Sequence, residues 1–267
     1  MKRPVVLITG ASSGIGAELG RAWGREGCDI ALLARRADRL EEAAVAVRST
    51  GARALPIVCD VTDRQAVGAA VAHTVEMLGP IDVAVANAGV ALKCRAAKFN
   101  LADAETIIRV NVFGMFNLYD AVIPSMIERR TGRFVGIASL AGLRGLPGSP
   151  VYSASKAAMQ AFLEGARGEL AVRGVKLITV NPGFVKSEIT RTNEFAMPFL
   201  METEDAAERI VRGVERGERT IEFPLPMKLA VRTMRALPDR LWDFFSLRAA
   251  RVRAKGSEGR STSQEQR

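Results

Sequence analysis

The sequence predicts a single α/β domain, built as a doubly wound parallel sheet with helices on both faces and a helical extension at the C-terminus. A chain of 267 residues is long enough for one large domain with a buried core, and short for two. Short β-branched runs alternate with stretches of helical length. The runs are apolar throughout, which is typical of parallel strands covered on both faces.

The expected strands are Val5–Thr9, Asp29–Ala34, Ala54–Cys59, Ile81–Ala86, Phe134–Ser139, Val175–Val180 and Thr220–Phe223. The expected helices carry apolar residues at three- and four-residue spacing: Gly16–Gly27, Asp38–Thr50, Asp63–Gly79, Asp103–Arg129, Tyr152–Val172 and Glu202–Gly217. Between the last two helices, Phe184–Phe199 has no clear period, and we expect it to form a mobile segment over a site.

Composition excludes several classes of protein. The three cysteines (Cys28, Cys59 and Cys94) lie far apart and form neither a disulfide framework nor a metal-binding spacing. The single histidine, His73, leaves zinc chemistry and a Ser-His-Asp triad without their other members, so no metal site is expected. Met1–Thr9 enters an apolar strand directly and lacks a signal-peptide core, and we expect a cytoplasmic protein.

Positive charge is concentrated near the C-terminus. The formal net charge is +9, and residues 228–255 hold eight basic side chains against two acidic ones. The rest of the chain is nearly balanced, so no nucleic-acid binding is expected of the main domain.

A glycine-rich loop joins the first strand to the first helix, in the run Thr9-Gly10-Ala11-Ser12-Ser13-Gly14-Ile15-Gly16. Glycines at positions 10, 14 and 16 allow a tight turn and a close approach of backbone to a ligand. The N-terminus of the following helix offers free N–H groups to a pyrophosphate. This context indicates a Rossmann-like dinucleotide-binding fold.

The loop has the spacing Gly-x-x-x-Gly-x-Gly, and in this it resembles the short-chain dehydrogenase/reductase family, whose opening is Thr-Gly-x-x-x-Gly-Ile-Gly. The resemblance covers about residues 4–190. It implies an oxidoreductase that uses a nicotinamide cofactor.

The second strand ends at Arg35 and Arg36, where an NAD-binding fold usually places an acid for the adenosine ribose. A guanidinium can bind a 2′-phosphate, which a carboxylate would repel. The charges therefore favour NADP, and the family pattern agrees. Either Ser12 or Ser13 can add a hydroxyl to the same phosphate.

Further cofactor contacts are implied by the resemblance. Asp60-Val61 is similar to the family's adenine contact, and Asn87-Ala88-Gly89 to its Asn-Ala-Gly motif. Pro182-Gly183 resembles the family's turn near the nicotinamide. Val185 would contact the carboxamide through its backbone, and Ser187 keeps a hydroxyl for a phosphate contact.

Tyr152 and Lys156 lie four residues apart on an expected helix, so they share a face. A neighbouring ammonium favours the phenolate and is expected to lower the pKa of the tyrosine, which makes it an acid–base group. Ser139, at the end of the fifth strand, can position a substrate oxygen. Asn111 matches the family's helix asparagine, which supports a water relay to the lysine. These four residues make up the family's catalytic tetrad.

The predicted function is hydride transfer between NADP(H) and a small-molecule carbonyl or secondary alcohol. An alternative is a nucleotide-sensing or membrane-docked binding protein with little turnover. The family resemblance also implies a homodimer or homotetramer, assembled through the helices that hold Asn111 and Tyr152.

Residues 1–225 are expected to form the NADP-binding catalytic domain, 226–255 a basic amphipathic helical extension and 256–267 a disordered tail. The extension, with Trp242 and Phe244 among arginines, suits peripheral contact with an anionic membrane through residues 226–253. It suits equally well packing on the domain or on a second subunit. Membrane contact would favour a lipophilic substrate.

Overall fold

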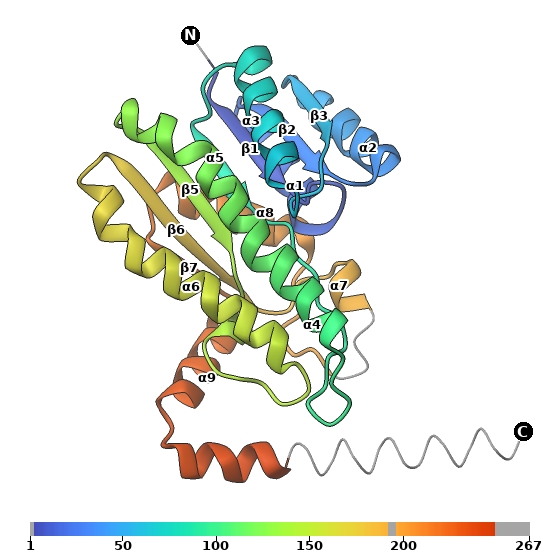
Figure 1. The fold of residues 1–267 in the computed structure, drawn as a ribbon, viewed down its shortest axis with the longest axis vertical. Coiled ribbons are helices and arrows are strands. Elements are labelled where there is room, and N and C mark those ends of the chain that lie inside the picture. The colour runs from blue at the N-terminus through green and yellow to red at the C-terminus, as the bar shows by residue number, and fades with distance from the viewer. Residues whose placement is uncertain (1–2, 192–195, 249–267) are drawn as a thin grey trace, which may run out of the picture.

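A parallel sheet forms the centre of the molecule. The computed structural model describes residues 3–191 and 196–248, and within them seven strands pair in the order β3-β2-β1-β4-β5-β6-β7, all parallel (Figure 1). The strands are β1 Val5–Thr9, β2 Asp29–Ala34, β3 Ala54–Val58, β4 Val83–Ala86, β5 Gly132–Ile137, β6 Val175–Pro182 and β7 Thr220–Phe223. The doubly wound architecture predicted from the sequence is confirmed.

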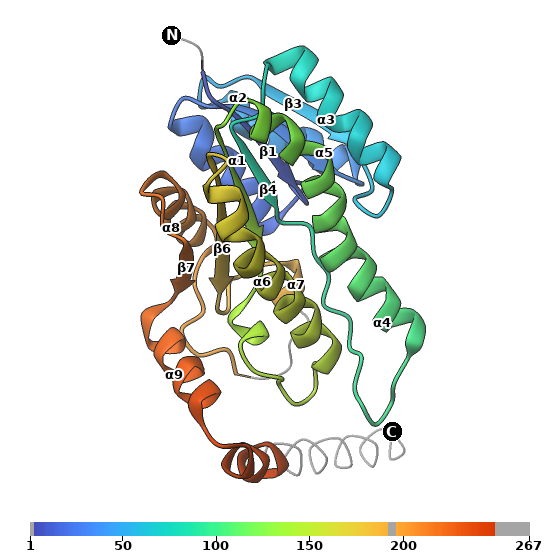
Figure 2. The ribbon, with the colours of Figure 1, turned by 60° about the vertical axis from the view of Figure 1, so that its left-hand side comes forward.

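Helices cover both faces of the sheet (Figures 1 and 2). They are α1 Gly14–Arg25, α2 Ala37–Arg48, α3 Arg64–Leu78, α4 Leu101–Ile108, α5 Gly114–Glu128, α6 Pro150–Ala171, α7 Glu188–Arg191, α8 Thr203–Glu215 and α9 Leu225–Ala236. Helices α1, α2 and α8 bury apolar side chains against one face, and α3, α5 and α6 against the other.

The two cores explain why the strands are apolar throughout. In β1, Val6 and Ile8 belong to the core under α1, α2 and α8. Val5 and Leu7 belong to the opposite core. Because successive side chains of a strand point to opposite faces, a strand covered on both sides needs apolar residues at every position.

The position of β1 creates the crevice of the fold. Strand β1 pairs with β2 on one side and with β4 on the other, through Leu7↔Ala31 and Leu7↔Ala84. The chain therefore leaves the middle of the sheet in two opposite directions. In open α/β sheets, ligands bind at such a switch point, beyond the carboxyl ends of the strands.

The long helix expected over Asp103–Arg129 is interrupted. Helices α4 and α5 are joined by a π-helical turn over Arg109–Phe113. Among the described residues, the stretch Leu101–Glu128 is long and apolar enough to cross a membrane by length and composition. In the structure, however, its side chains Met115 and Leu118 are buried in the core against the sheet, which accounts for its apolar character.

The edge strand β3 carries a proline at its centre. Pro56 lies opposite Leu32 of β2, and β2 is the neighbour that β3 pairs with in the sheet. Proline has no backbone N–H to donate, so within sheets it is confined mainly to edges, strand starts and bulges.

The C-terminal extension packs on the domain through polar contacts. In α9, Arg232 Nε donates to Glu222 Oε2 of β7 at 2.9 Å. Residues 239–248 are also helical, and there Asp239 pairs with Arg144 at 3.0 Å. The Arg144 guanidinium also lies 5.1 Å from the centre of the Trp242 ring. The division at residue 225 stays a prediction, and the tail 256–267 lies outside the described residues.

Asp29, at the start of β2, pairs with Arg53, and this pair provides a test of how much a buried carboxylate stabilises the fold. Burial acts to raise the pKa of its carboxyl group, but the hydrogen bonds and charge of Arg53 outweigh burial and hold this pKa below its usual value. Arg53 Nη2 donates to Asp29 Oδ2 at 2.7 Å. We expect Asp29→Asn to lower the free energy of unfolding by about 1–3 kcal/mol near neutral pH.

The expected loss depends on pH in a defined direction. A carboxylate with a lowered pKa stabilises the fold above about pH 3.9, its unfolded pKa, and this contribution disappears as pH falls through the folded pKa. Urea unfolding at several pH values measures the difference between variant and wild type, which shrinks below that pH. Glu42→Gln removes an exposed pair with Arg39 and is the control, with a change below about 0.5 kcal/mol.

Candidate active site

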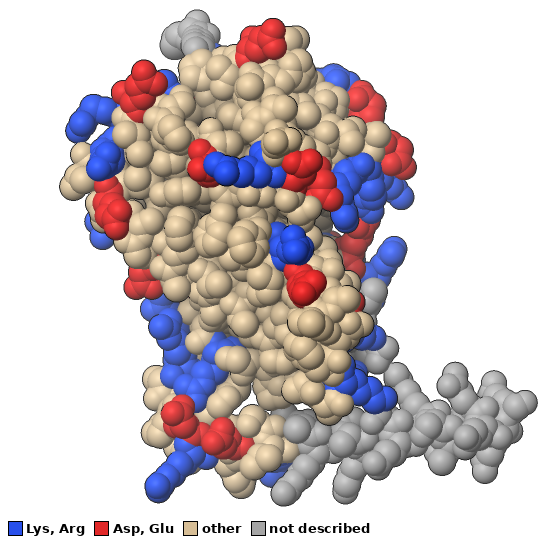
Figure 3. All heavy atoms as spheres, viewed as in Figure 1, with Lys and Arg blue, Asp and Glu red and all other residues tan. Residues whose placement is uncertain are grey.

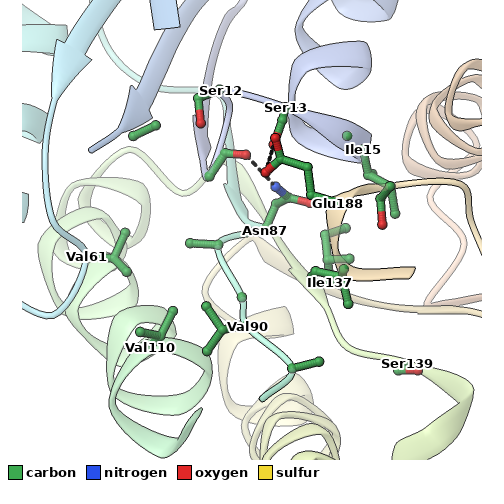
Figure 4. A pocket seen from close by; sticks show the side chains of 18 of the residues that line it. Ser12, Ser13, Ile15, Val61, Asn87, Val90, Val110, Ile137, Ser139 and Glu188 are labelled. Carbon is green, nitrogen blue, oxygen red and sulfur yellow. Dashed lines mark hydrogen bonds between the residues drawn. The ribbon is translucent and has the colours of Figure 1, made fainter. Parts of the chain in front are cut away.

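A cavity of about 490 Å³ opens at the carboxyl ends of the central strands. Figure 4 shows Ser12, Ser13, Asn87, Ile137 and Ser139 around it. The predicted residues that line it are Gly10, Ser12, Ser13, Gly14, Ile15, Arg35, Arg36, Asp60, Val61, Asn87, Ala88, Gly89, Ser139, Tyr152, Lys156, Pro182, Gly183, Val185 and Ser187. Of the predicted residues, Gly16 and Asn111 are not in its lining. The structure thus brings seven separated sequence motifs to one site.

The glycine loop leaves room for a ligand at one end of the cavity. Gly10 and Gly14 have φ values of +66° and +56°, which side chains rarely adopt. A methyl group on Gly16 would overlap the Gly10 carbonyl oxygen and lie 2.5 Å from Asn87 Nδ2. The Ser13 side chain does not cap α1, so N–H groups of the first turn remain available to an anion.

Asn87 holds the glycine loop against the end of β4. Its Nδ2 donates to the carbonyl oxygens of Thr9 and Gly10, at 3.0 and 3.1 Å. Its backbone N–H donates to Thr9 Oγ1 at 3.1 Å. The residue therefore has a structural task in the loop, and it also lines the cavity.

Positive charge lies at the end of β2, as expected. Arg36 Nη2 donates to Ser12 Oγ at 3.1 Å and to Ser13 Oγ at 3.0 Å. Arg35 forms a longer ion pair of 3.8 Å with Asp60. One guanidinium and two hydroxyls thus converge beside the glycine loop, which is a donor set suited to a phosphate.

Glu188 is a residue of this region that the sequence analysis missed. Its Oε1 accepts a hydrogen bond from Arg36 Nη1 at 3.1 Å, and its Oε2 accepts one from Ser13 Oγ at 3.2 Å. Figure 4 shows the Glu188 side chain beside Ser13, with a dashed line for the hydrogen bond between them. The residue follows the predicted Ser187 directly, but only tertiary structure brings it to Arg36.

Tyr152 and Lys156 lie on the same face of α6, as their spacing predicts. Lys156 is buried, and its Nζ donates to the carbonyl oxygen of Ile137 at 2.8 Å. The same Nζ lies 5.9 Å from the centre of the Tyr152 ring. Burial lowers the pKa of Lys156 to about 8.

The pKa of Tyr152 shifts against expectation. Burial raises it, and the hydrogen bond with Ser139 opposes burial without overcoming it. The prediction that the ammonium would lower this pKa is therefore wrong for the chain alone. The reason is that desolvation penalises the phenolate, while the ammonium lies over the ring face and hydrogen-bonds to a backbone carbonyl oxygen.

Asn111 lies in the π-helical turn and is fully buried. Its Oδ1 accepts from the Val90 N–H at 2.8 Å, and its Nδ2 donates to Ser155 Oγ at 3.0 Å. Ser155 Oγ in turn donates to the Tyr152 carbonyl oxygen at 2.7 Å. A methyl group on Gly89 would lie 3.3 Å from Asn111 Oδ1 and 3.5 Å from Lys156 Nζ. The water relay stays a prediction, whereas the link from Asn111 to α6 is direct.

Ser139 occupies the junction between β5 and a short 3-10 helix, Leu140–Gly142. Its Oγ accepts from the Ala141 N–H at 3.1 Å and lies 3.4 Å from the Pro182 carbonyl oxygen. These contacts fix the hydroxyl at the cavity wall, where Tyr152 also lies.

The segment after β6 covers the cavity in part. Val185 is buried and forms a parallel bridge with Met201. A methyl group on Gly14 would lie 3.3 Å from Ser187 Cβ, so the segment lies directly against the glycine loop. The predicted segment Phe184–Phe199 is thus correctly placed for its described part, and residues 192–195 lie outside the described residues.

Over residues 3–191 and 196–248, no group of three or more His, Cys, Asp or Glu side chains is arranged to hold a metal ion. The cavity has one end where Arg36 and the glycine loop offer donors suited to an anion, and another end lined by Ser139, Tyr152 and Lys156, whose hydroxyl, phenol and amine could exchange a proton. This arrangement suits a phosphate-bearing cofactor and an oxygen-bearing substrate.

Comparisons with known proteins agree with this arrangement. Residues 4–197 match the family model described as short chain dehydrogenase. The chain is 39% identical to an uncharacterised oxidoreductase of Myxococcus xanthus, over 91% of this chain and 96% of the relative. A short-chain dehydrogenase from Sphingobium yanoikuyae, solved with NADPH, superposes with a TM-score of 0.76 at 28% identity, covering 95% of each chain.

A second solved structure supports the fold alone. A short-chain dehydrogenase/reductase from Burkholderia phymatum, solved with NAD, superposes with a TM-score of 0.80 at 23% identity, covering 86% of this chain and 92% of the other. The two structural relatives therefore hold different nicotinamide cofactors.

Two glycines that both lie in helices provide a test of the loop. Gly16→Ala is expected to lower the free energy of unfolding by about 1–3 kcal/mol, since the methyl group collides with the Gly10 carbonyl oxygen and Asn87. Gly165→Ala, where a methyl group meets nothing within 4 Å, is the control and is expected to stabilise α6 by up to about 1 kcal/mol. Thermal and urea unfolding measure both; equal effects would contradict the close approach.

Proposed function

The chain belongs to the short-chain dehydrogenase family and is an oxidoreductase of that type, and we propose that it transfers a hydride between NADP(H) and a carbonyl or secondary alcohol. One observation carries the proposal: Ser139, Tyr152 and Lys156 line the same cavity as the glycine loop and Arg36. The comparisons favour this oxidoreductase over a binding protein with little turnover.

The preference for NADP over NAD rests on charge. Arg36 and the hydroxyls of Ser12 and Ser13 form one donor cluster beside the glycine loop. Such a cluster can bind a 2′-phosphate, whereas no acid of β2 or its end is placed to accept from a ribose there. The residues present therefore fit NADP, whose nicotinamide C4 supplies or accepts the hydride when it is bound.

The residues at the other end of the cavity handle the proton. Tyr152 gives its phenolic proton to the oxygen formed in ketone reduction, and takes it back from an alcohol in the reverse direction. A raised phenol pKa keeps that proton in place near neutral pH. Ser139 donates a hydrogen bond to the same substrate oxygen, and Lys156 lines the cavity with its Nζ 5.9 Å from the centre of the Tyr152 ring.

We propose a cytoplasmic homodimer or homotetramer that assembles through α4, α5 and α6. Leu101 and Phe113 are large apolar side chains that are 64% and 54% exposed on the surface of this helical layer. They line a second hollow of about 440 Å³. The three cysteines are unpaired and buried, which fits a reducing compartment.

The extension supports peripheral contact with an anionic membrane. In the helix at 239–248, Leu241, Phe244, Phe245 and Arg248 share one face by their spacing. The contacts of Asp239 and Trp242 with Arg144 turn the opposite face towards the domain.

Phe244 and Phe245 are 61% and 51% exposed. Figure 3 shows basic side chains at this lower end of the molecule, together with acidic ones. A lipophilic ketone or alcohol is the substrate class that fits this location.

Tyr152→Phe tests the proposed chemistry. Without the phenolic oxygen, we expect kcat/KM for NADPH-dependent reduction of a panel of ketones to fall at least 100-fold, while binding of NADPH changes little. Stopped-flow or steady-state oxidation of NADPH measures the rate, and a fluorescence titration measures binding. Tyr119→Phe, on α5 away from the cavity, is the control. Undiminished rates for Tyr152→Phe would contradict the role of this residue.

The membrane contact has its own test. We expect the full chain to sediment with vesicles of phosphatidylcholine and phosphatidylserine, and Phe244→Ser/Phe245→Ser to lose most of this binding. Phe99→Ser, at another exposed phenylalanine, is the matched control. Binding that survives the double substitution, or that is equal on purely neutral vesicles, would count against contact through this face.

A further inference from the structure

Glu188 places a negative charge in the donor cluster that would bind the cofactor's phosphate. Arg36 forms hydrogen bonds with Ser12, Ser13 and Glu188 at once, with distances of 3.0 to 3.1 Å. Glu188 in turn accepts a hydrogen bond from Ser13 Oγ at 3.2 Å. Its carboxylate therefore uses two of the same donors that a 2′-phosphate needs.

Glu188 comes from the covering segment and not from the nucleotide-binding half of the sheet. It begins α7, directly after Ser187, which lies against Gly14 of the glycine loop. The contact between Glu188 and Arg36 thus joins two elements that lie 152 positions apart in the chain. The pair holds the start of α7 beside the phosphate end of the cavity.

The pair is weak enough for a phosphate to replace it. The Arg36 and Glu188 side chains are 45% and 49% exposed, so water screens their attraction. A phosphate carries more charge than a carboxylate and offers three acceptor oxygens to the guanidinium and the hydroxyls. Both anions cannot occupy the cluster without repelling each other.

We propose that Glu188 is a tethered competitor of the 2′-phosphate: it binds Arg36 and Ser13 until NADP(H) displaces it, and so it sets the affinity and selectivity for the phosphorylated cofactor. The inference rests on the proposed use of NADP. It adds that the net affinity of Arg36 for the phosphate is lowered by the free energy needed to break the pair with Glu188. Displacement also removes the hydrogen bonds that join the start of α7 to Arg36 and Ser13.

The test compares dissociation constants for NADPH, NADH and adenosine 2′,5′-bisphosphate in four proteins. These are the wild type, Glu188→Gln, Arg36→Gln and the double variant. We expect Glu188→Gln to tighten NADPH and adenosine 2′,5′-bisphosphate about two- to fivefold, because an exposed ion pair is weak. Affinity for NADH should stay unchanged. In the Arg36→Gln background, the gain from Glu188→Gln should be smaller, because only the contact of Glu188 with Ser13 and its repulsion of the phosphate remain to be removed.

Glu202→Gln is the matched control. Glu202 is an exposed carboxylate that follows the same segment and pairs with Lys186 at 3.0 Å instead of with Arg36. We expect its substitution to leave all three dissociation constants unchanged. Isothermal titration calorimetry measures every affinity without any turnover.

The outcomes separate the two proposals. Equal affinity of the wild type for NADPH and NADH, unchanged in Arg36→Gln, would overturn the preference for NADP. A wild type that prefers NADPH, with an affinity that Glu188→Gln leaves unchanged or weakens, would overturn the competitor role; weakening would mean that Glu188 orients Arg36 for the phosphate. An equal gain in NADH affinity would also overturn it, since the effect would not depend on the 2′-phosphate.

Discussion

The close approach of the glycine loop to the end of β4 is the constraint from which the site follows. A methyl group on Gly10 would lie 2.7 Å from the Ala88 Cα, so the two backbones are in contact. Asn87 satisfies the carbonyl oxygens of Thr9 and Gly10 at that contact. The chain diverges on either side of β1, and this contact holds the crevice at a fixed width. The N-terminus of α1 then faces a cavity whose far wall carries Tyr152.

Burial decides the charge states at the proton-transfer end. It raises the pKa of Tyr152 and lowers that of Lys156, so both groups are biased towards their neutral forms. The two shifts move the pKa values of the phenol and the amine apart, because the pKa of Tyr152 rises from its ordinary value of 10.0 while that of Lys156 falls from 10.5 to about 8. The phenol therefore holds its proton more firmly than the neighbouring ammonium does.

Much of this could be predicted from the sequence, because the relevant signals are local. β1, β2 and β7 have the predicted bounds, and they are followed directly by Gly10, Arg35 and Pro224, which mark their ends in the sequence. The motif residues that line the cavity meet there because each follows the carboxyl end of a parallel strand or lies on α6. Residues at such positions lie at the same edge of the sheet, however the side chains around them pack.

The features that sequence reasoning missed are those that depend on tertiary contacts. The π-helical turn at Arg109–Phe113 does not disturb the apolar spacing, so the stretch reads as one helix. Glu188 meets Arg36 only through the path of the chain after β6. The direction of the shift in the pKa of Tyr152 depends on how far the folded chain excludes water from the phenol. The spacing of residues along a helix does not predict that burial.

Pro56 has a consequence for how copies of this chain can meet. An unprotected outer strand exposes a row of hydrogen-bonding groups that invites another strand to continue the sheet, and this is a common route to aggregation. The proline interrupts that row in the middle of β3, and β7 at the opposite border spans only Thr220–Phe223. Continuous sheets running from one molecule into the next are therefore disfavoured. Association is left to helix surfaces, where side-chain shape selects the partner.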